Sequence, residues 1–433
     1  MLAIAFIISR IIFANAGPVF FDSPEYLARL ADPNLWHALT SGHLPLHAGY
    51  ILLLWPIYHL SPSLVIPFQI LLGLTGIYCF YKITNSKLAA IIVSLLPLLW
   101  ISQVTIMMEA VYVPLFFISA YFLVRRRYLL FSIFYFLSTT THPGVLLWLP
   151  WLIYIAPSRR SSILYSLISI LVGTVSFIPK LGEHVQFSLL PTLRNILIPT
   201  LRNNTNLIVI LSLIAAVQVL WIERAGGATP SGAEGKAAEH SQPQHRTATL
   251  ILLWLGPTLI TNQWWDSLFF GRHALIASFG LAYLTALLIS NHKFLISITI
   301  AYLLLTSVPA LSLLRGPIPY LEEAKFAATL PPDGIYVTSH FARPQLQGVY
   351  RGTTIFVNEP GWAAKLPATA SALYISPSAI SDPYDLYSGP YLHLLSVSPA
   401  TYRSPRRLDY YDPITQLWFR FFSSPIFSSA SRI

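Results

Sequence analysis

The sequence predicts an all-α polytopic membrane protein with a small α/β domain at its C-terminal end. Of the 433 residues, 55% are hydrophobic and only 10% are charged, whereas a soluble domain carries about 25% charged residues. The mean hydropathy is +0.60. Apolar runs recur from Met1 to Leu314, and several are long enough to cross the ~30 Å of hydrocarbon in a bilayer. We therefore expect about eleven transmembrane helices in residues 1–314.

Proline and charged residues set the ends of the expected spans. Ser61-Pro62 divides the second run into Tyr50–Leu60 and Ser63–Tyr81, because proline ends a helix and constrains the residue before it. His142-Pro143 predicts a break between two short helices for the same reason. The candidate spans are residues 1–20, 50–81, 88–103, 106–124, 128–141, 143–156, 161–178, 206–222, 248–262, 268–290 and 294–314.

Basic residues fall in alternate loops between these spans. Lys82, Lys87, Arg125–Arg127 and Lys293 would share one side, which the positive-inside rule assigns to the cytoplasm. The N-terminus and a linker at 223–247 would then be cytoplasmic, and the C-terminal domain extracytoplasmic, in a plasma or inner membrane. This topology explains the net charge of +10, so membrane lipids are expected partners and nucleic acid is not.

Arg10 lies inside the first apolar run, where a charged side chain is costly. Two explanations stay open. Either the chain begins upstream, or the span is short and Arg10 faces a polar interior.

The composition changes at residue 315, and residues 315–433 predict a small soluble domain. Tyr320–Leu330 has the pattern of a short amphipathic helix. Strand-like runs follow, separated by Gly, Pro and Ser turns. They are Gly334–Thr338, Thr353–Asn358, Ala372–Ser376 and Leu392–Ser398.

The loop 21–49 carries the most informative polar residues of the chain. Asp22 and Glu25 are carboxylates at the edge of an expected span, where such groups are functional candidates. Asp22 or Ser23 would also cap a helix at Pro24–Ala31. Whether Asp22 or Glu25 is the catalytic carboxylate stays open. Tyr26, His47 and Tyr50 complete the candidate group in this loop and at the next span.

Further polar candidates fall at the same expected interface. Glu109 opens one span and His142 ends another, and Asp266 precedes Arg272 and His273. An arginine there suits a bidentate phosphate contact. The alternative for Arg272 is an interfacial anchor, and the alternative for Glu109 is an ion pair with Arg272. The histidines of the first loop are too loosely spaced to predict a metal site, which leaves open whether a divalent cation takes part.

Together these residues resemble the motifs of the GT-C superfamily of membrane glycosyltransferases. The resemblance is to the protein mannosyltransferase and aminoarabinose transferase branch, which uses polyprenyl- or dolichyl-phosphate sugars. It rests on the order of several short motifs. They are Asp22-Ser23-Pro24-Glu25-Tyr26, Leu44-Pro45-Leu46-His47 before Tyr50, Met108-Glu109-Ala110-Val111-Tyr112, Thr141-His142-Pro143-Gly144 and Phe270-Gly271-Arg272-His273.

The resemblance implies a GT-C-like catalytic module at 1–314 and a hexosyltransferase activity. It does not identify a cofactor. A sugar would move, with inversion, from a polyprenyl-phosphate donor to a lipid, glycan or protein acceptor outside the cytoplasm. Asp22 or Glu25 would be the general base, and Arg272 with His273 would bind the donor phosphate. Tyr26, His47, Tyr50, Glu109, His142 and Asp266 would contact substrate. The alternative is a transporter or lipid flippase in which Glu109, His142 and Arg272 form a polar path.

Overall fold

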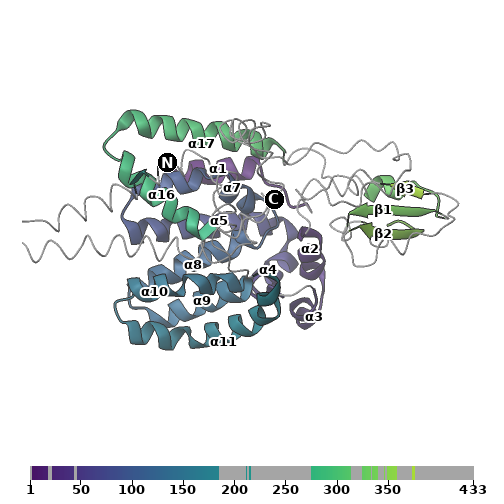
Figure 1. The fold of residues 1–433 in the computed structure, drawn as a ribbon, viewed down its shortest axis with the longest axis horizontal. Coiled ribbons are helices and arrows are strands. Elements are labelled where there is room, and N and C mark those ends of the chain that lie inside the picture. Colours follow the sequence, from purple (N-terminus) through teal and green to yellow (C-terminus); the bar gives the residue numbers. More distant parts are fainter. Residues whose placement is uncertain are drawn as a thin grey trace, which may run out of the picture.

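A computed structural model shows an array of helices and a small three-stranded sheet (Figure 1). It describes residues 2–17, 22–42, 46–184, 211, 214–215, 275–313, 324–332, 334–339, 346, 349–357 and 373–375.

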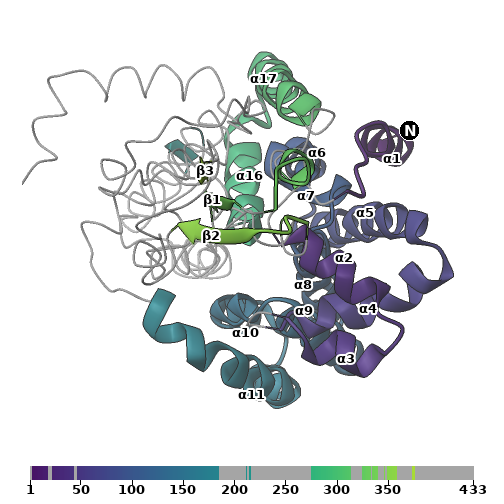
Figure 2. The same cartoon turned by 90° about the vertical axis from the view of Figure 1, so that its right-hand side faces the viewer.

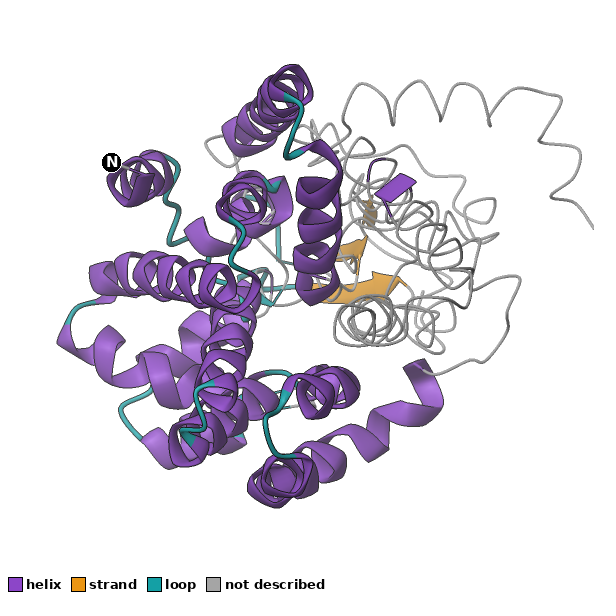
Figure 3. Ribbon diagram, turned by 90° about the vertical axis from the view of Figure 1, so that its left-hand side faces the viewer, coloured by secondary structure: helices purple, strands orange, loops and turns teal. Residues whose placement is uncertain are grey.

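Helices follow one another through short connections over most of the described chain (Figure 3). The first group is α1 (Leu2–Ile12), α2 (Ser23–Ala31), α3 (Leu35–Thr40), α4 (Ala48–Leu60), the 3-10 turn η1 (Pro62–Leu64) and α5 (Val65–Thr84). Next come α6 (Lys87–Leu95), α7 (Pro97–Val104), α8 (Glu109–Val124), α9 (Tyr128–Thr141), η2 (Pro143–Trp148) and α10 (Leu149–Ile155). The last are α11 (Arg159–His184), α16 (Leu275–Ile289) and α17 (Lys293–Leu313).

Proline sets several of the helix ends, as the sequence predicts. The break at Ser61-Pro62 separates α4 from η1 and α5. His142 is the C-terminal cap of α9, and Pro143 begins η2. A further break precedes Pro97, inside the expected span 88–103. The helices α6 and α7 meet there at 64°.

The expectation of a polytopic membrane fold with about eleven crossings is wrong for the described residues. Among them, only the helix Pro62–Thr84 is long and apolar enough to cross a bilayer. There are two such spans if the bent pair α6 and α7 counts as one. Half of the most apolar stretch of Pro62–Thr84 is buried inside the protein. Breaks divide the apolar runs of the sequence into helices such as α1, whose 11 residues extend only ~16 Å at 1.5 Å per residue.

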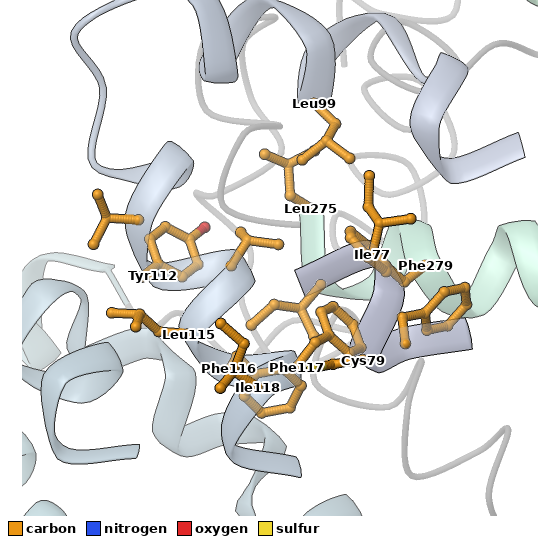
Figure 4. Packing of buried hydrophobic residues seen from close by; sticks show 14 of the residues in the cluster. Ile77, Cys79, Leu99, Tyr112, Leu115, Phe116, Phe117, Ile118, Leu275 and Phe279 are labelled. Atoms are coloured by element: carbon orange, nitrogen blue, oxygen red, sulfur yellow. The ribbon is translucent and has the colours of Figure 1, made fainter. Parts of the chain in front are cut away.

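The packed centre of the array lies where α5, α8 and α16 meet (Figure 4). Phe117 of α8 stacks on Phe279 of α16 with 4.1 Å between ring centroids, and Phe80 of α5 meets Phe279 edge-on. Gly76 allows the close approach of α5 to α8, since a Cβ there would lie 2.6 Å from the Cα of Pro114. As a result α8 is buried on nearly all sides, and Glu109 begins a helix with no exposed face.

The sheet has the strand order β2-β1-β3, with both pairings parallel. The strands are β1 (Ile335–Ser339), β2 (Thr353–Val357) and β3 (Leu373–Ile375), close to three of the predicted runs. Val337 pairs with Ile355 on one side and Ile375 on the other. The fourth predicted strand, Leu392–Ser398, and the linker 223–247 lie outside the described residues. The helix predicted at Tyr320–Leu330 is seen over residues 324–327.

The helices that carry the first candidate residues lie at one end of the array. Figure 1 shows α2 and α3 at the end nearest the sheet. In Figure 2, which faces that end, α2 and α3 lie beside α4 and near the start of α8. The chain therefore brings loop 21–49 and the sheet to the same end of the array.

Candidate functional site

Side chains of α2, α4 and α8 meet His47, which precedes α4, and His142, which follows α9, in one group of rings that we call the aromatic cluster. Tyr26 of α2 packs on Tyr50 of α4 with 4.9 Å between ring centroids, and meets His47 edge-on at 5.8 Å. His47 lies parallel to His142 at 6.2 Å, and His142 stacks on Tyr112 of α8 at 4.8 Å. All five side chains are buried, so contacts between distant parts of the chain fix their relative positions.

His47 is oriented by a hydrogen bond and by an unusual backbone conformation. Its Nδ1 lies 2.7 Å from the carbonyl oxygen of Thr141. A carbonyl only accepts, so Nδ1 carries a proton in this contact. The residue has φ 46 and ψ 37, a left-handed conformation that is uncommon outside glycine. Such backbone positions cluster at functional sites.

Tyr50 connects the aromatic cluster to a buried amide and to Glu109. Its hydroxyl donates to Gln69 Oε1 at 3.1 Å, and Gln69 Nε2 donates to the carbonyl of Thr105 at 2.8 Å. Burial, and to a smaller extent the Glu109 carboxylate, raises the pKa of the Tyr50 phenol. Glu109 is fully buried in the first turn of α8, where the helix dipole favours a negative charge.

Asp22 precedes α2 and is buried, with 5% of its surface exposed. Its side chain makes no capping hydrogen bond, and the Ser23 hydroxyl donates instead to the carbonyl of Ile106 at 2.8 Å. The prediction that one of these side chains caps the helix is therefore wrong. The Ser23 bond and a contact from the Tyr26 hydroxyl to Met108 Sδ at 3.5 Å hold the start of α2 against the residues before Glu109.

Glu25 has a different environment from Asp22. Its Oε1 lies 3.5 Å from Nη1 of Arg29, one helical turn away, and its side chain is 26% exposed. Burial lowers the pKa of Arg29, while the charge of Glu25 raises it. Glu25 therefore serves as the counter-charge of a buried cation.

Three predicted residues cannot be placed in this group. Asp266, Arg272 and His273 lie outside the described residues, so the phosphate-binding role of Arg272 and His273 and the Glu109–Arg272 ion pair stay predictions. Within the described ranges, no group of three or more His, Cys, Asp or Glu side chains is arranged to hold a metal ion.

Sequence reasoning missed Tyr112, Gln69 and Arg29 as members of the site region. Tyr112 lies three residues after Glu109, a spacing that places both on one face of a helix, so the motif contained the signal. Arg29 is four residues after Glu25, the spacing of a helical ion pair. Gln69 gave no signal, because its partners Tyr50 and Thr105 are distant in the sequence.

Comparisons of the chain with protein-family models, with curated proteins and with solved structures found no match.

Proposed function

We propose that the protein is a glycosyltransferase that moves a sugar from a polyprenyl-phosphate donor to an acceptor hydroxyl or amine, with inversion. Asp22 is the general base. The observation that carries this proposal is the burial of the Asp22 side chain at the start of α2, one helical turn before Tyr26 of the aromatic cluster. The resemblance of the motifs around Asp22, Glu109 and His142 to the GT-C superfamily supplies the donor class.

The proposed step needs one base and one cation. The acceptor O–H or N–H gives its proton to Asp22, and the acceptor atom attacks the anomeric carbon of the sugar. The bond from that carbon to the donor phosphate oxygen breaks, and the phosphate leaves with the electron pair. General-base catalysis contributes about 10²–10⁴-fold to such a rate, and a cation at the leaving phosphate adds electrostatic stabilisation. Arg272 and His273 are proposed for that second role.

The aromatic cluster supports a role in binding the sugar and the acceptor. Binding sites for small molecules are lined mainly by apolar and aromatic side chains, with a few polar groups that fix orientation. Tyr26, Tyr50 and Tyr112 provide ring faces here, while His47 and His142 add ring nitrogens. Asp22 lies one helical turn before Tyr26, and Glu109 lies one turn before Tyr112 in α8.

Contact with membrane lipids is part of the proposal, because the donor carries an isoprenoid chain. It is supported by large apolar side chains on the outer faces of α11 and α17. Leu164, Ile168 and Leu171 are 63–70% exposed, and Phe294 and Leu305 are 71–75% exposed. Exposed apolar areas of this kind mark interaction surfaces.

The test is transfer from radiolabelled polyprenyl-phosphate sugars in membranes that contain the wild type or Asp22→Asn. We expect Asp22→Asn to lower incorporation by about 100-fold or more. Asp32→Asn is the matched control, because it removes a carboxylate from the same loop that lies outside the aromatic cluster, and it should leave transfer unchanged. Equal incorporation by wild type and Asp22→Asn would overturn the assignment of the base.

A further inference from the structure

Arg29 holds the two ends of the segment that leads from α3 into α4. Its side chain is 4% exposed. Nε donates to the carbonyl of Ala38 at 2.8 Å, and Nη2 donates to the carbonyl of Leu46 at 2.6 Å, with a longer contact to that of Leu39 at 3.4 Å. One guanidinium therefore joins α2, the end of α3 and Leu46, two residues before α4.

The contact with Leu46 acts directly on His47. The peptide unit between Leu46 and His47 is planar, so a fixed Leu46 carbonyl also fixes the direction of the His47 N–H bond. The φ of 46° at His47 is the rotation about its N–Cα bond, measured from that peptide plane. Arg29 thus helps to hold the left-handed conformation from which the His47 ring reaches Thr141, Tyr26 and His142.

Glu25 and Gly42 enclose the same guanidinium. Glu25 supplies the carboxylate at 3.5 Å. Gly42 has φ +105, and a Cβ at this position would lie 2.2 Å from Glu25 Oε1 and 3.1 Å from Arg29 Nη1. The loop is folded closely over the ion pair, and only glycine fits at this place without displacing it.

We propose that Glu25 and Arg29 form a positioning pair that sets the His47 ring in the site, and that Glu25 is not the proton acceptor. A carboxylate next to a guanidinium is held in its charged form, which makes it a weaker base. The inference rests on the proposed function for its kinetic part, since His47 is taken as a substrate contact there. The placement of the His47 ring by Arg29 is independent of the reaction.

The first test follows the His47 ring without any substrate. Histidine is labelled with ¹⁵N in the full-length protein, and His47→Gln identifies the His47 signals. We expect Arg29→Gln to shift these signals and their pH titration, while Arg160→Gln, which removes an exposed arginine of α11, leaves them unchanged. Unchanged His47 signals in folded Arg29→Gln would overturn the positioning role. Arg29→Lys keeps the charge, and serves in the same test if Arg29→Gln does not fold.

The second test is a double-mutant cycle on transfer. Arg29→Gln should raise KM about ten-fold in the wild-type background and have little effect in the His47→Ala background, because coupled residues are not additive. Additive effects would show that Arg29 does not act through His47.

Glu25→Gln completes the kinetic comparison. It should lower kcat less than about ten-fold, well below the loss expected of a general base, and a loss equal to that of Asp22→Asn would overturn the assignment. If wild-type protein transfers no sugar, the proposed function fails, while the histidine signals still decide the positioning role.

Discussion

Two buried arginines, Arg29 and Arg10, are stabilised by different kinds of partner. Arg29 and Arg10 are 4% and 1% exposed. Arg29 has the Glu25 carboxylate and backbone carbonyls as partners. For Arg10 no salt bridge to a described residue is found. The two sites show how a buried cation can be accommodated with a counter-charge and without one.

Neutral groups surround the Arg10 guanidinium. Nε donates to Gln103 Oε1 at 3.1 Å, Nη1 donates to the Ser9 hydroxyl at 3.1 Å, and Nη2 contacts the carbonyl of Ser94. The guanidinium carbon also lies 3.8 Å from the ring centroid of Phe6 and 4.3 Å from that of Trp100. In the structure, α1 is a short helix whose Arg10 contacts both polar groups and aromatic rings.

The difference between the sites shows what a carboxylate adds. Burial lowers the pKa of Arg10 to about 9. Burial also lowers the pKa of Arg29, but the charge of Glu25 opposes that shift. A carboxylate opposes the effect of burial at Arg29, whereas burial is the cause of the shift at Arg10. The cation with the carboxylate is the one that holds the candidate site.

Removal of the Arg29 side chain should have the largest effect on stability. Arg29→Met leaves Glu25 without its counter-charge and the carbonyls of Ala38 and Leu46 without their donor. Breaking a buried pair costs about 3–5 kcal/mol, and we expect about 3 kcal/mol because Glu25 is partly exposed. Chemical denaturation of the two proteins measures the difference. Glu25→Gln should recover part of the loss in the Arg29→Met background, and a further loss there would contradict the uncompensated charge as the cause.

The turn over the Arg29 pair should be the next most sensitive position. Gly42→Ala places a Cβ 2.2 Å from Glu25 Oε1 at φ +105, so the pair or the turn must move. We expect a loss of about 2 kcal/mol from the strained backbone and the overlap together. Thermal unfolding measures it, with Gly17→Ala as a control at another loop glycine. If Gly42→Ala is as stable as the wild type, the loop is not closed over the ion pair.

The corresponding change at the other arginine should cost less. Arg10→Met removes a buried cation together with its desolvation cost, and a flexible apolar side chain can pack between Phe6 and Trp100. Replacing buried charges by apolar groups of similar size is often neutral. The lost hydrogen bonds leave a net cost of about 1 kcal/mol. A loss in denaturation experiments as large as that of Arg29→Met would remove the contrast between the two sites.

Local chemistry explains which parts of the fold could be predicted from the sequence. The breaks before η1 and η2 were predictable from Pro62 and Pro143, because proline disfavours a helical conformation at the residue before it, although Pro56 and Pro114 lie inside α4 and α8. The expectation of a polytopic membrane fold was wrong, because apolarity alone does not separate a helix packed in protein from one in lipid. The strands of the sheet were predicted as short runs between Gly, Pro and Ser turns, whereas their parallel pairing required the structure.

The candidate site divides in the same way. Carboxylates and histidines in apolar sequence are conspicuous, so Asp22, Glu109, His47 and His142 could be selected. Their arrangement depends on contacts between distant residues, such as the bond from Ser23 to Ile106. The sequence therefore could not decide between Asp22 and Glu25, since the distinction lies in the Arg29 partner and the absent cap.

The exposed pair Asp32–His37, in the same loop as Arg29, should contribute least to stability. Asp32 contacts His37, and this hydrogen bond, followed by that from the Asn34 N–H, holds the pKa of Asp32 below its usual 3.8. The lowered pKa in the folded state means that the stabilisation is present above about pH 4 and is lost as the pH falls through the folded value. Thermal midpoints between about pH 2 and pH 6 should therefore fall more for wild type than for Asp32→Asn. Parallel curves for the two proteins would show that this exposed pair contributes nothing, and that burial of the ion is what makes the Arg29 pair strong.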